Sequence, residues 1–95
     1  MTATDIDPEI LVPRYRRGVK LRFDEVRGTF VLLAPEKVFV PDEIAAEILQ
    51  LIDGERKLTT IAAQLAEKFG APIDVVTKDI LIILTDLAAR GAIEF

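Results

Sequence analysis

The sequence predicts a small α+β domain of the winged-helix-turn-helix kind, in which a three-stranded antiparallel sheet is followed by three helices. Apolar and polar residues alternate in parts of the first 40 positions, whereas apolar residues recur at helical spacing over the remainder. All five glycines fall between these periodic segments. Turn chemistry and periodicity therefore agree along the chain. Ninety-five residues provide one modest hydrophobic core, which predicts a single domain.

Three strands are expected between residues 19 and 40. Residues 19–24 alternate apolar with charged side chains, which is typical of a half-buried strand. Residues 29–33 are apolar on both faces, as in a central strand, and residues 37–40 form the third strand. Pro35 supplies the preset φ of a turn between them. Because the connections are short, the strands are expected to be antiparallel.

Three helices are expected at residues 42–52, 59–69 and 72–90, each followed within two residues by a glycine that can end it. Apolar residues at helical spacing mark the side of each helix that faces the core. The expected core positions are Ile44, Ile48, Ile52, Ile61, Leu65, Phe69, Ile73, Val76, Ile80, Ile83, Leu84 and Leu87. The second and third helices are joined by the tight segment 70–72, which is helix-turn-helix geometry.

Outside these elements, residues 1–13 contain two prolines and no periodicity, and we expect them to form a flexible N-terminal tail. Residues 92–95 are suited to a short final strand. The domain proper is therefore expected to span residues 14–95.

Composition argues against most catalytic and metal chemistry. The sequence has no cysteine, histidine, serine or asparagine, so the usual nucleophiles, neutral-pH bases and zinc ligands are missing. No glycine-rich phosphate-binding loop is present. We therefore expect a protein that is not an enzyme by itself and that holds no metal or cofactor.

Membrane insertion and secretion are also not expected. No apolar stretch approaches the roughly 20 residues that a spanning helix needs. The first seven residues are acidic and lack an apolar run, which argues against a signal peptide or an anchor. A cytoplasmic location is the expectation.

Charge is divided unevenly along the chain. Residues 14–27 hold six basic and two acidic residues, for a net charge of +4, whereas residues 36–95 hold six basic and eleven acidic residues, for −5. Charges on the strand at 19–24 are best explained as guards of a sheet edge. Arg14, Arg16 and Arg17 precede that strand, and they form a candidate surface for an acidic partner.

DNA binding is the first alternative, because the fold class includes many transcription regulators. A recognition helix needs basic or amide side chains directed at the groove. The third helix instead carries Asp74, Asp79 and Asp86 against Lys78 and Arg90, and its carboxylates would repel a polyanion. No nucleic-acid partner is therefore expected.

Two further surfaces are candidates for binding. The third helix is apolar on a second side, where Val75 and Ile82 lie beside Asp79 and Asp86. This side could line a groove, pack on the N-terminal tail or contact a second copy of the protein. The third strand, residues 38–40, lacks charged guards and could accept an added strand if no helix or tail covers its edge.

Four segments carry a resemblance to a known family. Residues 33–36 (Leu-Ala-Pro-Glu), 45–49 (Ala-Ala-Glu-Ile-Leu) and 53–56 (Asp-Gly-Glu-Arg) resemble the centre of the PqqD family. Residues 87–91 (Leu-Ala-Ala-Arg-Gly) resemble the family's C-terminal pattern. The likeness extends from about Pro13 to the C-terminus.

The resemblance implies a peptide chaperone of pyrroloquinoline quinone (PQQ) biosynthesis. Such proteins bind the ribosomal precursor peptide PqqA and present it to the radical SAM enzyme PqqE, which cross-links a glutamate and a tyrosine of the peptide. Related domains recognise the leader peptides of other modified peptides, which add beside the third strand and lie against the third helix. Carried onto this chain, the implied peptide-binding residues are Val38, Phe39, Val40, Val75, Asp79, Ile82 and Asp86.

Alternative functions stay open on the sequence alone. A winged-helix DNA-binding regulator is the second hypothesis, and an assembly subunit that dimerises through the third helix is the third. A monomer and a homodimer are equally compatible with the sequence.

Overall fold

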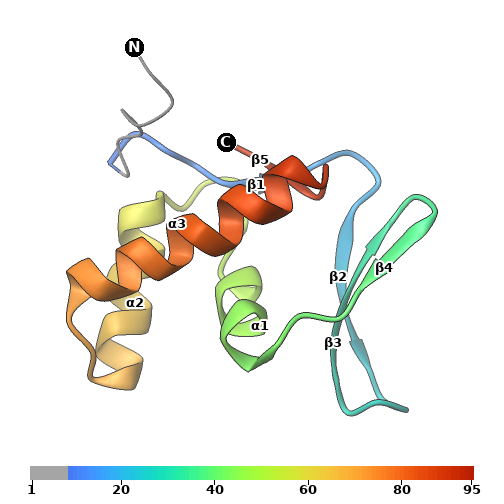
Figure 1. The fold of residues 1–95 in the computed structure, drawn as a ribbon, viewed down its shortest axis with the longest axis horizontal. Coiled ribbons are helices and arrows are strands. Elements are labelled where there is room, and N and C mark those ends of the chain that lie inside the picture. Colours follow the sequence, from blue (N-terminus) through green and yellow to red (C-terminus); the bar gives the residue numbers. More distant parts are fainter. Residues whose placement is uncertain (1–8) are drawn as a thin grey trace.

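The three-stranded antiparallel sheet and the three helices all form, in the expected order. A computed structural model describes residues 9–95. In chain order the elements are β1 (Arg14–Tyr15), β2 (Lys20–Asp24), β3 (Thr29–Ala34), β4 (Lys37–Phe39), α1 (Glu43–Gln50), α2 (Leu58–Phe69), α3 (Ile73–Ala89) and β5 (Ile93–Glu94). Figure 1 shows the sheet of β2, β3 and β4 on one side of the molecule and the helices on the other. The α+β class is confirmed, and the winged-helix likeness stays a prediction.

The sheet has the order β2-β3-β4, so β3 is central as predicted and β4 lies at an edge. Leu32 in β3 is paired with Leu21 and with Phe39, and it is fully buried in the core. Side chains of residues paired across a sheet lie on the same face. The face that carries Leu32 therefore packs on the helices, and the face that carries Leu33 and Val38 is turned away from them.

A second, two-stranded sheet joins the two ends of the domain. β1 pairs with β5 in antiparallel register, with Arg14 opposite Glu94 and Tyr15 opposite Ile93. The expected final strand at residues 92–95 is thereby confirmed. The strand at 14–15 was not predicted, because a strand of two residues shows no periodicity.

The predicted tail of residues 1–13 falls mostly outside the described residues, which begin at position 9. Its last part packs on the domain. The Leu58 backbone N–H donates to the Leu11 carbonyl at 2.9 Å, and Pro13 is fully buried. The boundary at residue 13 stays a prediction, but residues 11–13 contact the helical layer.

Three helices enclose the core together with one face of the sheet. Most predicted core positions are buried, among them Ile48 in α1, Ile61 in α2 and Leu84 in α3. Three predicted core positions are instead exposed: Ile44, Phe69 and Ile73. Each lies at a helix end, where the neighbouring elements no longer cover it. Periodicity identifies the apolar stripe of a helix, but it does not show how far that stripe is covered.

Candidate functional site

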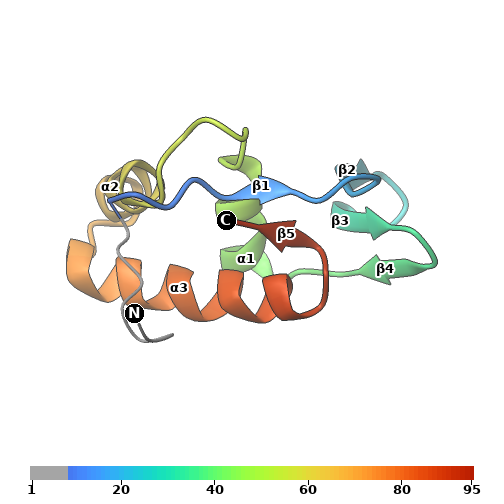
Figure 2. The same cartoon turned by 90° about the horizontal axis from the view of Figure 1, so that it is seen from above.

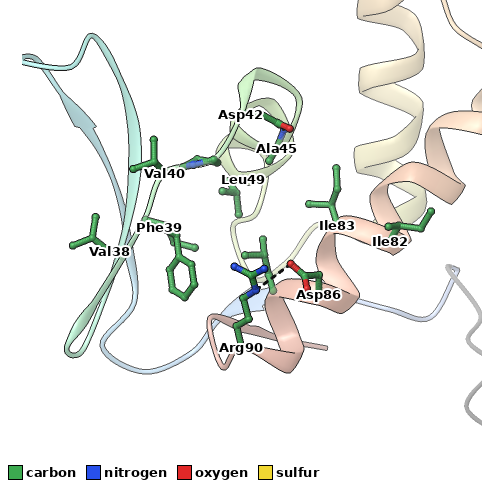
Figure 3. Close-up of a pocket in the computed structure, with 13 residues that line it drawn as sticks. Val38, Phe39, Val40, Asp42, Ala45, Leu49, Ile82, Ile83, Asp86 and Arg90 are labelled. Atoms are coloured by element: carbon green, nitrogen blue, oxygen red, sulfur yellow. Dashed lines mark hydrogen bonds and ion pairs between the residues drawn. The ribbon is translucent and has the colours of Figure 1, made fainter.

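A groove of about 670 Å³ lies between β4, the start of α1 and the C-terminal half of α3. This volume is within the range of typical ligand pockets. The groove is lined mainly by apolar side chains, with carboxylates and one guanidinium at its rim. Figure 3 shows the labelled side chains on the three elements that border the groove. It is therefore a partly apolar site at the edge of the sheet.

β4 forms one wall of the groove. Phe39 points into the space between β4 and α3, whereas Val38 points away from it (Figure 3). The register agrees, because Phe39 is paired with the buried Leu32 and Val38 with Leu33 on the outer face. Val38 is accordingly 59% exposed. β4 thus offers one aromatic side chain and its backbone edge to the groove.

The free edge of β4 presents unpaired backbone groups. Residues 34 and 37 close a two-residue hairpin, and such a closing pair is hydrogen-bonded. Since hydrogen-bonded pairs alternate along the ladder, the pair of Leu32 and Phe39 is bonded as well, and Val38 directs its N–H and C=O outward. Within residues 9–95, no strand pairs with β4 on that side. Such an edge can accept an added strand.

Charge at the rim is mostly negative. The Asp42 carboxylate caps α1 by accepting a hydrogen bond from the Ala45 backbone N–H at 2.8 Å. On α3, Asp86 pairs with Arg90 over 3.2 Å between Oδ2 and Nε. Both members of the pair are more than half exposed, so the pair contributes little stability and can exchange partners. The rim therefore favours ligands with basic groups beside apolar ones.

The fold brings five of the seven predicted peptide-binding residues into one groove: Val38, Phe39, Val40, Ile82 and Asp86. Asp79 lies one helical turn further along α3, where it lines a smaller hollow with Ile82 and Asp42. Val75 is half exposed and lies outside the lining of these hollows. The roles of all seven residues in peptide binding stay predictions.

Eight of the lining residues were not predicted as site residues, among them Asp42, Ala45, Ile83 and Arg90. Asp42 and Ala45 belong to the start of α1, which only the tertiary fold brings beside α3. For Ile83 and Arg90 a sequence signal existed, because residues 76, 79, 83, 86 and 90 recur at helical spacing and form one stripe of α3. Periodicity assigned Ile83 to the core, and the structure leaves it half-buried at the groove.

The predicted partner surface lies elsewhere. Arg14, Arg16 and Arg17 are exposed, and within the described part of the chain they form no ion pair. None of them lines the groove. Figure 2 shows β1, which carries Arg14, on the opposite side of the molecule from β4 and α3. The two predicted surfaces are therefore separate.

The segment 53–56 is structural rather than part of the groove. Asp53 Oδ1 accepts backbone hydrogen bonds from Arg56 at 2.7 Å and Glu55 at 2.9 Å. These N–H groups, that of Arg56 foremost, hold the pKa of Asp53 below its ordinary value. Arg56 Nη1 also donates to the Leu51 carbonyl at 3.0 Å. The motif thereby shapes the loop between α1 and α2.

Among residues 9–95 no three carboxylates gather closely enough to suggest a metal site. The helices of this same part of the chain are too short or too polar to cross a membrane.

Comparison with known proteins gives one consistent result. Residues 29–93 match the family model described as coenzyme PQQ synthesis protein D (PqqD). A protein named PqqA binding protein from Bradyrhizobium diazoefficiens is 47% identical over 79 residues, which cover 83% of this chain and 77% of that protein. A PqqA binding protein from Gluconobacter oxydans is 38% identical over 96% of this chain and 95% of that protein.

Solved structures agree with these matches. The solution structure of the PqqD part of PqqCD from Methylobacterium extorquens, described as a stand-alone RiPP recognition element, superposes with a TM-score of 0.79 at 42% identity. That superposition covers 92% of this chain and 93% of the other. The crystal structure of PqqD from Xanthomonas campestris superposes with a TM-score of 0.56 at 34% identity, over 95% of this chain and 94% of the other.

Proposed function

The chain belongs to the PqqD family, and from that premise we propose that it binds the PqqA precursor peptide along β4 and presents it to the enzyme PqqE in PQQ biosynthesis. The observation that carries the proposal is the open edge of β4 beside an apolar groove. The names of its relatives support PqqA as the peptide, and the apolar groove beside β4 supports this site for it.

The peptide adds to the sheet as a fourth strand next to β4. Val38 donates its N–H to the peptide backbone and accepts in return through its C=O, and Val40 is positioned to continue the ladder. Backbone pairing of this kind provides affinity with little dependence on sequence. It therefore holds the peptide in an extended conformation without selecting it.

Selection comes from the groove. Alternate side chains of the added strand point to the same face as Phe39, toward Ile82 and Ile83 of α3. Apolar side chains at those positions are buried on binding, at about 25 cal/mol per Å² of apolar surface. The ordering of a disordered peptide costs about 2–5 kcal/mol of the gross interaction. Affinity thus depends on a few well-placed apolar side chains.

The domain contributes no chemistry to the modification. Its groove is lined by aliphatic and aromatic side chains, carboxylates and Arg90, without an activated nucleophile. Its contribution is to hold the peptide near PqqE, which raises the effective concentration of substrate at the enzyme.

The proposal is tested by substituting Val38, whose backbone and side chain face different directions. Val38→Pro removes the outward N–H, and proline is tolerated on edge strands. Val38→Ala keeps that N–H and shortens only the outer-face side chain. Titration calorimetry with synthetic PqqA should show that the proline variant loses about 1–2 kcal/mol of binding free energy, whereas the alanine variant binds as the wild type does.

A folded Val38→Pro variant with undiminished affinity would rule out strand addition at β4. Unchanged amide NMR signals of residues 38–40 on addition of PqqA to the wild type would exclude the whole proposal. Phe39→Pro is unsuitable as a test, since the Phe39 N–H points inward toward β3 and its loss would disrupt the sheet itself.

A further inference from the structure

Two apolar side chains that helical spacing assigns to the core, Ile44 of α1 and Phe69 of α2, are 61% and 56% exposed. They lie together. Both line a hollow of about 200 Å³ between the three helices, whose floor is formed by Ile48, Leu65 and Ile80. The lining of this hollow is almost entirely apolar, so it can take one apolar side chain from a ligand.

The hollow is linked to the groove at β4 by shared lining residues. A smaller hollow of about 160 Å³ shares Ile82 and Ile83 with the groove and Ile44 with the inter-helix hollow. One stripe of α3, from Arg90 to Val76, borders all three in turn. At 1.5 Å per residue this stripe is about 21 Å long, a length that an extended peptide covers with about six residues.

Carboxylates stand at the passage between the groove and the inter-helix hollow. Asp42 at the start of α1 and Asp79 on α3 both line the small connecting hollow. Within the described residues neither of them pairs with a basic side chain. A basic side chain of a ligand placed at this point gains two neighbouring carboxylates that have no basic partner, although Asp42 also caps α1.

We propose that the inter-helix hollow is a second subsite for the bound peptide, which takes an apolar side chain of the segment that leaves the β4 groove along α3, next to a basic residue at Asp42 and Asp79. This inference rests on the proposed function and extends it from an edge strand to a longer recognition path. The exposed Ile44 and Phe69 are then side chains that the peptide covers.

A second copy of the chain could cover the same apolar residues. The link to the β4 groove favours the peptide, because a ligand that leaves the groove along α3 then reaches the hollow. Charge disfavours a symmetric dimer through this surface, because Asp42 and Asp79 of the two copies would then approach each other.

The experiment uses the full chain and synthetic PqqA. Ile44→Ala and Phe69→Ala remove opposite walls of the hollow, and Ile73→Ala is the matched control, since Ile73 is also an exposed apolar residue at a helix end but lines none of the three hollows. Calorimetry should show about tenfold weaker binding for each of the first two variants and no change for the control. Asp79→Asn should weaken binding less, with an effect that salt removes.

NMR titration distinguishes failure of the second subsite from failure of peptide binding as a whole. Shifts at residues 38–40 together with shifts at Ile44, Phe69 and Val76 support the second subsite. Shifts at residues 38–40 alone, with full affinity in Phe69→Ala, overturn the second subsite and leave peptide binding intact. Absence of shifts at both places overturns both. Concentration-dependent shifts at Ile44 and Phe69 without peptide would show a second copy there and overturn the inference.

Discussion

Tyr15 is the one tyrosine of the chain, and it ties the two-stranded sheet to the helical layer. Its hydroxyl donates to the Leu49 carbonyl of α1 at 2.5 Å. Burial raises the pKa of the Tyr15 hydroxyl above its ordinary value of 10.0, because the tyrosinate form would lose its hydration. A side chain that does not line the groove therefore stabilises the helix that forms one wall of it.

Titration of Tyr15 tests directly whether its hydroxyl is buried, since absorbance at 295 nm reports the ionisation of this tyrosine alone. We expect no ionisation near pH 10 in the folded protein, and a midpoint that falls to the ordinary value in urea. Because the folded pKa is raised, the stabilising contribution is complete below the unfolded pKa and is lost as pH rises above it. Unfolding midpoints should fall above pH 10 in the wild type and much less in Tyr15→Phe. A midpoint near 10 in the folded protein would contradict the burial of this hydroxyl.

The hairpin of β3 and β4 positions the free edge strand, and its turn is strained. Pro35 and Glu36 form the two-residue loop, and among residues 9–95 Glu36 is the only non-glycine residue with a positive φ, 65°. Proline followed by a residue with positive φ is the pattern of a type II turn, which favours glycine at the second position. The left-handed conformation costs an ordinary L-residue about 1–2 kcal/mol.

Glu36→Gly should therefore raise the free energy of unfolding by about 0.5–1 kcal/mol, after the greater chain entropy of glycine is subtracted. The matched control is Glu25→Gly in the exposed turn between β2 and β3, where φ is not positive. There only the entropic loss applies, so the control should be destabilised by a similar amount. Urea unfolding measures both. Equal destabilisation of the two variants would show that Glu36 is not strained.

Element positions could be predicted closely because local chemistry marks them. Gly70 ends α2 with a left-handed φ of 62°, as the sequence indicates. Pairing between distant segments could not be predicted: Arg14 meets Glu94 at the other end of the chain. Ile44 was misassigned to the core because spacing reveals an apolar face without revealing its neighbour. For the same reason, residue spacing could not predict that Asp42 lines the groove.

At the scale of the whole molecule, charge and shape divide the surface into two regions. The β4 groove is rimmed by carboxylates, whereas Arg14, Arg16 and Arg17 lie along β1 and the turn that follows it. An adaptor needs two such surfaces, because a surface covered by peptide cannot also contact the enzyme. Under the proposed function, the basic surface would stay available to an acidic region of PqqE while the peptide occupies the groove.

Reversal of charge on this basic surface should weaken association of the proposed adaptor with PqqE without changing its binding of PqqA. In Arg16→Glu/Arg17→Glu, we expect unchanged affinity for PqqA and at least about tenfold weaker association with PqqE at low salt, because like charges then face each other. The matched control is Lys57→Glu/Lys78→Glu, which changes net charge equally at exposed positions outside the basic surface. Surface plasmon resonance across salt concentrations should show a smaller salt dependence for the arginine variant, since fewer attractive charges remain to be screened. Equal loss in both variants would mean that PqqE senses net charge alone, and the basic surface would then have no specific role.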